Sequence, residues 1–264
     1  MQKLLLGLIL LFLAAGTVLG NSKRAYEDYL YQLDVYRQKN NEFKLARNEY
    51  EKFKTLTSQN TALEKTIAML VSRAQLLRSY LLLLSEKVQE NPGVTFSDAG
   101  LYQSLIKNEM EFLDGHMQLV SAIGTLEDAD AVASDLSSHY IILTTSEYQT
   151  IIGLSLGQLN MLKQTYDESL EQVEALVNVY KSSYKPSKQA TIDRWLISIK
   201  DKRDLYERKV SDIASRNSGL KSTTIEDIQV EVNGLVGDIQ QAKAYLADGT
   251  SFMNELLVLL KTMD

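Results

Sequence analysis

The stretch Asn60–Val88, NTALEKTIAMLVSRAQLLRSYLLLLSEKV, decides the fold of this chain. Its stripe residues recur at alternating spacings of three and four, at Asn60, Leu63, Ile67, Leu70, Ala74, Leu77, Leu81, Leu84 and Val88. Such a pattern predicts a helix whose stripe packs against another helix, as in a coiled coil. Because neither Gly nor Pro occurs between Arg24 and Gln89, we expect one helix of roughly 100 Å, with a slip of phase near Tyr50–Leu56.

The next stretch predicts a helix running back along the first. Asn91-Pro92-Gly93 is a strong turn sequence, and Thr95 with Asp98 resembles a capping box. A short connection between long amphipathic helices implies an antiparallel hairpin. Its predicted stripe contains Leu101, Leu105, Asn108, Phe112, Leu119, Ile123 and Leu126.

Helical spacing is interrupted once more before it resumes. The sequence GTLEDADAVA, residues 124–133, predicts a kink or a restart with Asp128 or Asp130 as the new cap. The stripe then continues through Tyr148, Ile152, Leu159, Leu162, Tyr166, Val173, Val177 and Tyr180.

The C-terminal third predicts a second, shorter hairpin. Ser182–Lys188 contains Pro186, which suits the first turn of a helix. A helix is expected over Thr191–Asn217, and Thr223 with Glu226 forms a capping box for the last one. That last helix has the most regular stripe in the chain, which Gly249 could break: Ile225, Ile228, Val232, Leu235, Ile239, Ala242, Leu246, Gly249, Met253, Leu256, Leu260 and Met263.

These elements predict an all-α protein made of long antiparallel helical hairpins. The expected parts are a leader (1–20), a long coiled-coil hairpin (21–183) and a shorter hairpin packed on it (184–264). We expect an elongated bundle from which the tip near residues 91–97 projects as a coiled-coil arm. Only 13 Gly and two Pro in 264 residues favour helices over an all-β fold.

The first 20 residues predict export. Lys3 precedes an apolar core from Leu4 to Ala15, and Val18 and Gly20 fit a signal-peptidase site before Asn21. The alternative is an uncleaved membrane anchor, because the apolar run is near the lower limit for spanning a bilayer. Either reading places the body outside the cytoplasm, in the periplasm or outside the cell.

The composition argues against several functions. The net charge of -6, with no basic arm, disfavours nucleic-acid binding. The absence of cysteine removes thiol catalysis, thiolate metal sites and disulfides. No metal, nucleophile-elbow or phosphate-loop motif occurs, so we expect neither an enzyme nor a cofactor. His116 and His139 could form a metal or proton site, but we expect both to be ordinary surface or boundary residues.

Two groups of residues are candidate contacts. Tyr26, Tyr29 and Tyr31 would form an aromatic belt if the leader stays in a membrane, and otherwise pack in the coiled coil or meet a partner. The second group could contact anionic lipid or glycan, although pairing with the acidic stretch Asp167–Glu174 is preferred. It consists of Lys200, Lys202, Arg203, Arg208 and Lys209.

The sequence therefore predicts a non-enzymatic exported scaffold or protein-interaction module at the cell envelope. It would present helix faces to a protein partner, and self-association is one form of this. Membrane contact is expected only if residues 4–20 are retained. The alternative is an extracytoplasmic helical bundle that binds a ligand or serves a sensory partner.

Overall fold

The computed structural model describes residues 20–221 and 224–261, so the predicted leader lies outside the described residues. These ranges contain six α-helices and no strand, which confirms the predicted all-α bundle. The elements are α2 (Gly20–Phe53), α3 (Leu56–Glu90), α4 (Phe96–Ser121), α5 (Leu126–Tyr180), the short 3-10 helix η1 (Lys181–Ser183), α6 (Pro186–Ser218) and α7 (Ile225–Lys261).

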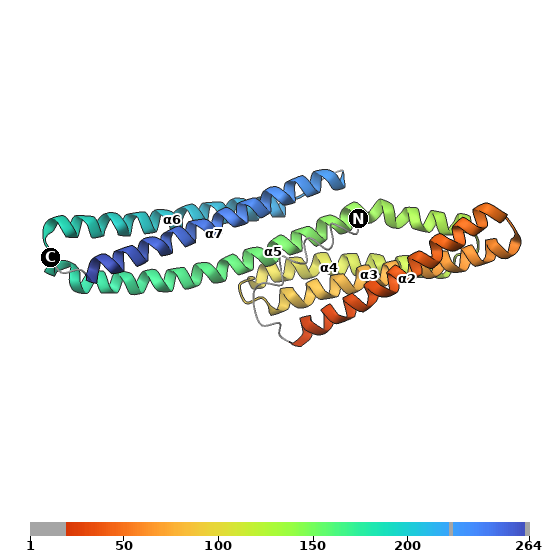
Figure 1. Ribbon diagram of the computed structural model, residues 1–264, viewed down its shortest axis with the longest axis horizontal. Coiled ribbons are helices and arrows are strands. Elements are labelled where there is room, and N and C mark those ends of the chain that lie inside the picture. Colours follow the sequence, from red (N-terminus) through yellow and green to blue (C-terminus); the bar gives the residue numbers. More distant parts are fainter. Residues whose placement is uncertain (1–19, 222–223, 262–264) are drawn as a thin grey trace.

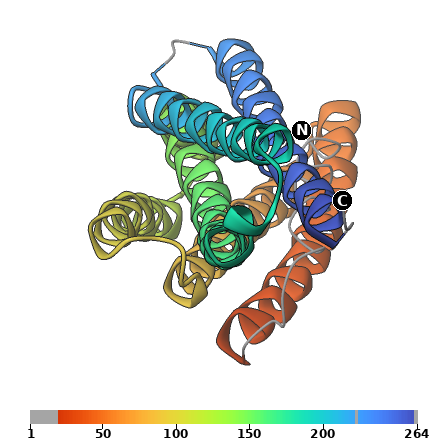
Figure 2. The same ribbon diagram turned by 90° about the vertical axis from the view of Figure 1, so that its left-hand side faces the viewer.

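Helix α5 is the spine of the molecule. It has 55 residues and is therefore roughly 80 Å long. Helices α3 and α4 pack along its first part, with α2 packed on α3, and α6 and α7 pack along its second part (Figure 1). Figure 2, seen from the end that holds the α5–α6 turn, shows α5, α6 and α7 grouped together. One apolar cluster lies in the C-terminal group and two lie in the N-terminal group, and α5 contributes side chains to all three.

The single helix predicted from residue 24 to 89 is wrong, because the chain reverses at Lys54 and Thr55. Lys54 adopts a left-handed backbone conformation with φ of 51°. The Thr55 hydroxyl accepts a hydrogen bond from the Ser58 backbone N–H, and the Ser58 hydroxyl accepts one from Thr55 N–H. This capping box ends one helix and starts the next. The phase slip near Tyr50–Leu56 marks the reversal.

The projecting coiled-coil arm is not confirmed. The α3–α4 turn, which was its predicted tip, packs against the middle of α5 (Figure 1). Asn91 Nδ2 donates to Leu154 O at 2.9 Å, and Asn160 Nδ2 donates to Gly93 O at 3.0 Å. A Cβ on Gly93 would lie 1.8 Å from Gly157 O, so glycine is required for this close approach.

The predicted caps are partly confirmed. The Thr95 hydroxyl caps α4 by accepting from Asp98 N–H, as expected. The chain restarts between α4 and α5, but the cap of α5 is Thr125 and not Asp128 or Asp130. Asp128 is the third helical residue of that capping box, where its carboxylate accepts from Thr125 N–H.

The last helix begins at Ile225 and is not interrupted. Thr223, and with it the predicted box with Glu226, lies outside the described residues; the Thr224 hydroxyl accepts a hydrogen bond from Asp227 N–H. Helix α7 continues through Gly249 to Lys261. The stripe predicted for it is buried from Ile228 to Leu256.

The stripe predicted for α4 is wrong by one residue. Leu101 and Leu119 are about half exposed. The side that faces the core consists of Tyr102, Ile106, Glu109, Leu113, His116 and Val120. Two of these six core positions, Glu109 and His116, are polar. A prediction from apolar spacing alone therefore chose the neighbouring face. This rotation places a carboxyl and an imidazole inside the bundle.

Candidate functional sites

The three N-terminal tyrosines occupy different environments. Tyr29 is buried and its ring centroid lies 5.4 Å from that of Tyr80 on α3. Tyr26 is partly buried against the same apolar cluster. Tyr31 is 65% exposed, so it is the one side chain of the three that a partner or lipid surface reaches directly.

Most of the candidate anionic-surface residues form ion pairs with carboxylates of the C-terminal bundle. Nζ atoms of three lysines lie 2.7–2.9 Å from carboxylates, in the pairs Lys200–Glu174, Lys202–Asp248 and Lys209–Asp238. Arg208 is exposed. The pairs join α6 to α5 and α7, which favours the interpretation that this basic stretch complements acidic neighbours.

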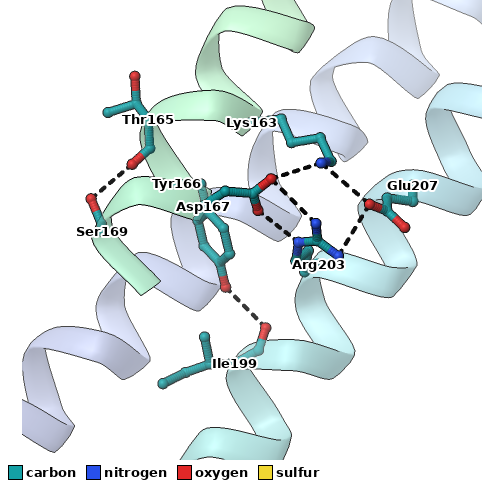
Figure 3. A network of polar contacts seen from close by, with 8 residues as sticks. All are labelled: Lys163, Thr165, Tyr166, Asp167, Ser169, Ile199, Arg203 and Glu207. Atoms are coloured by element: carbon teal, nitrogen blue, oxygen red, sulfur yellow. Dashed lines mark hydrogen bonds and ion pairs between the residues drawn. The ribbon is translucent and has the colours of Figure 1, made fainter. Parts of the chain in front are cut away.

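Arg203 is at the centre of an ion-pair network between α5 and α6 (Figure 3). Its Nε donates to Asp167 Oδ1 at 2.6 Å, and another guanidinium nitrogen lies 3.2 Å from Glu207. Lys163 donates to the same Asp167 at 2.7 Å. Burial opposes ionisation of Asp167, but these hydrogen bonds outweigh it and hold its pKa below the ordinary value.

The opposite side of α5 is an exposed face that no helix within residues 20–221 and 224–261 covers. We call it the α5 face; its central positions follow a heptad spacing and are Leu162, Thr165, Ser169, Gln172, Leu176 and Val179. All six are exposed, Val179 to 65%. Thr165 and Ser169 donate their hydroxyl protons to carbonyls one turn back, so they present little unmet polarity (Figure 3).

A polar cluster lies inside the N-terminal bundle. Glu109 is 3% exposed, and its two carboxylate oxygens contact Ser146 Oγ at 2.9 Å and His139 Nε2 at 2.7 Å. The Phe112 ring stacks on His139 at 3.5 Å between centroids. Serine donates to the carboxylate and not to the imidazole, so the cluster lacks the nucleophile–base pair of acyl-transfer enzymes.

Glu147 lies beside this cluster and was not identified from the sequence. Its side chain is largely buried, and its Oε1 atom is enclosed without a hydrogen-bond partner among the described residues. Burial, with a smaller contribution from the charge of Glu109, raises the pKa of Glu147 to about 8. Glu147 is therefore a proton-binding group whose titration falls near neutral pH.

Of the two histidines, His116 differs from the surface or boundary residue that the sequence predicts, whereas His139 is partly buried, as a boundary residue is. His116 is buried, and burial lowers its pKa, although Asp135 lies 3.7 Å away and opposes this effect. His139 is joined to Glu109. No group of three or more His, Asp or Glu side chains suited to a metal ion occurs within residues 20–221 and 224–261.

A cavity of about 380 Å³ lies where the two bundles meet. It is lined by the start of α4, the middle of α5 and the end of α6. Gln149 Nε2 donates to Asn217 O at 3.0 Å, and Asn217 Nδ2 donates to Gln149 O at the same distance. These reciprocal bonds hold α6 on α5 beside apolar walls that include Leu101 and Leu156.

One helix in the described part of the chain, α3, is long and apolar enough to cross a membrane by length and composition. More than half of its most apolar window, 56%, is buried in the bundle, which suits a core helix. Comparison with protein-family models, with curated proteins and with solved structures finds no match.

Proposed function

We propose that this protein is a non-enzymatic, exported helical scaffold that binds a protein partner through the α5 face. The supporting observation is the continuous exposure of neutral side chains along five turns of α5. In the C-terminal part, α6 and α7 cover the other side of α5 and leave this face open. A stripe of this kind is a docking surface for an amphipathic helix.

The flanks of the α5 face suggest what the partner helix is like. Glu168 and Glu171 are exposed beside it. A partner helix with an apolar seam and flanking Lys or Arg would match both the neutral centre and the acidic edge. Such a helix could come from a second copy of this chain or from a different envelope protein.

Photo-crosslinking in the native host tests this proposal. A photoreactive residue replaces Gln172 on the α5 face or, as a matched control, the exposed Gln241 on α7. We expect a discrete crosslinked product from position 172 and none from position 241. Leu176→Arg in the same chain should reduce that product at least about tenfold, since it puts a charge in the contact. A product of twice the chain mass would identify self-association.

The control for this experiment is folding. Leu176 is exposed, so Leu176→Arg should leave the helical content and the melting temperature nearly unchanged. Equal crosslinking from positions 172 and 241, or a product whose amount Leu176→Arg does not change, would contradict the proposal.

The intact mass of the recovered chain tests export. An exported chain beginning at Asn21 supports cleavage of the leader, and a membrane-bound chain that retains Met1 supports the anchor.

The cavity between the bundles favours a second candidate function, the binding of a small molecule. Its volume lies within the range of ligand sites, and it combines leucine walls with Gln149, Asn160 and Asn217. Native mass spectrometry of the protein from its own host should then show a bound molecule. Leu101→Trp, which fills the partly exposed wall, should remove it. A chain that is always recovered without added mass would count against this function.

A further inference from the structure

The α2–α3 turn lies at one extremity of the molecule (Figure 1). All residues from Glu51 to Thr57 are exposed, including two large apolar side chains, Phe53 at 56% and Leu56 at 72%. A capping box between Thr55 and Ser58 fixes the start of α3 directly after the turn. We call the segment Lys52–Leu56 the tip.

The tip is basic although the chain is acidic. The sequence from Lys44 to Leu63 has four basic and two acidic residues, against a net charge of -6 for the whole chain. Its acids, Glu49 and Glu51, precede the tip, and no carboxylate follows until Glu64. Lys52 Nζ lies 5.1 Å from the centroid of the Phe53 ring, so cation and aromatic ring are presented together.

Lys54 occupies a backbone conformation that usually selects another residue. Its φ of 51° lies in the left-handed region, where glycine and asparagine are the least strained residues. The turn therefore has a lysine where glycine would be easier to accommodate. A cation is therefore held at the end of the hairpin at some conformational cost.

We propose that the tip docks on an anionic membrane surface, with Phe53 and Leu56 entering the headgroup region and Lys52 and Lys54 contacting lipid phosphates. Apolar side chains flanked by lysines are the combination that binds such surfaces. The tip lies at the far end of α2, roughly 50 Å from Gly20. This interaction is separate from the α5 face and does not depend on it.

Tryptophan fluorescence on vesicles tests the proposal with the full chain. Phe53→Trp is made in a Trp195→Phe background, so that the tip holds the single tryptophan. The matched control is Phe96→Trp in the same background, because Phe96 is an exposed phenylalanine far from the tip along the chain. Vesicles contain phosphatidylcholine alone or with about 30 mol % phosphatidylglycerol. Any insertion of residues 1–19 is common to all variants.

We expect the emission of the Phe53→Trp chain to shift to shorter wavelength with the anionic vesicles only, while the Phe96→Trp emission stays constant. Adding Lys52→Gln and Lys54→Gln should weaken the response up to about 30-fold, and salt should weaken it too. No shift at position 53, an equal shift with neutral vesicles, or an equal shift at position 96 would overturn the proposal. A tip that recognises only a protein gives the first of these results.

Discussion

Glu147→Gln is expected to stabilise the protein at pH 8 and to have little effect near pH 5. The side chain is largely buried, and its Oε1 atom has no hydrogen-bond partner within the described ranges. A neutral amide of the same shape avoids the cost of an ionised carboxylate at this site. The substitution therefore changes the pH dependence of the free energy of unfolding.

The environment of Glu147 explains the direction. Burial is the main cause of its raised pKa, and Glu109 adds repulsion between like charges. Burial is the main cause of the raised pKa of each surrounding tyrosine, and the charge of Glu147 is the second cause. The titratable side chains around it come from α2, α3, α4 and α5 and are Tyr29, Tyr80, Glu109, Tyr140 and Tyr148.

The sign follows from linkage. A carboxyl with a pKa of about 8 in the folded state and an ordinary pKa of 4.5 in the unfolded state binds its proton more tightly when folded. Its contribution is fully present below pH 4.5 and is lost as the pH rises toward 8. Between pH 5 and pH 8 the wild-type chain should lose on the order of 2 to 4 kcal/mol relative to Glu147→Gln.

Denaturant unfolding of both chains at several pH values measures this difference. The stability gained by Glu147→Gln should grow from pH 5 and level off above about pH 8. Glu171→Gln is the matched control, because Glu171 is an exposed glutamate on the same helix, and its effect should not vary with pH in this way. A pH-independent difference for Glu147→Gln would show that Glu147 is ionised in the folded state.

Gly249→Ala should destabilise the protein by about 1–3 kcal/mol, although alanine is the better helix former. A Cβ at position 249 would lie 2.1 Å from the hydroxyl oxygen of Tyr166 and 2.8 Å from two of its ring carbons. Tyr166 is buried and donates to Ile199 O at 2.9 Å (Figure 3). Burial raises the pKa of Tyr166 to about 12, so the hydroxyl keeps this proton at ordinary pH.

Gly237→Ala is the matched control on the same helix. A Cβ at position 237 meets nothing within 4 Å, so this substitution should stabilise the protein by up to about 1 kcal/mol. Tyr166→Phe removes the nearest atom. The double variant with Gly249→Ala should therefore lose less free energy of unfolding than the two single substitutions lose in sum. If both glycine substitutions stabilise the chain equally, α5 and α7 do not approach each other as described.

Gly249 shows one limit of sequence reasoning. Helical periodicity continues on both sides of it, so the residue can be read as a break or as part of the stripe. Only the position of Tyr166 on α5 shows why a glycine is there. A residue without a side chain gives no pattern that distinguishes a helix end from a close contact between helices.

Helix α4 and the first hairpin show a second limit. Glu109 and His116 lie at core positions, and a search for apolar periodicity counts them as surface residues. The predicted face was therefore rotated by one residue, and the cluster with His139 and Glu147 was missed. Similarly, the role of Thr55 as a cap is evident only from the reversal at Lys54.

The sequence by itself determined that the protein is helical, which side of α7 is buried, which side of α3 is buried from Leu70 to Val88, and that α4 begins at a cap on Thr95. These features are local, because spacing along one helix and the hydrogen bonds of its first turn depend on nearby residues. The tertiary structure alone decided where the first hairpin turns, which cations are paired, and that Glu147 is enclosed. A stripe specifies that a face is covered but not by which helix, and the energy of a buried charge depends on neighbours distant in the sequence.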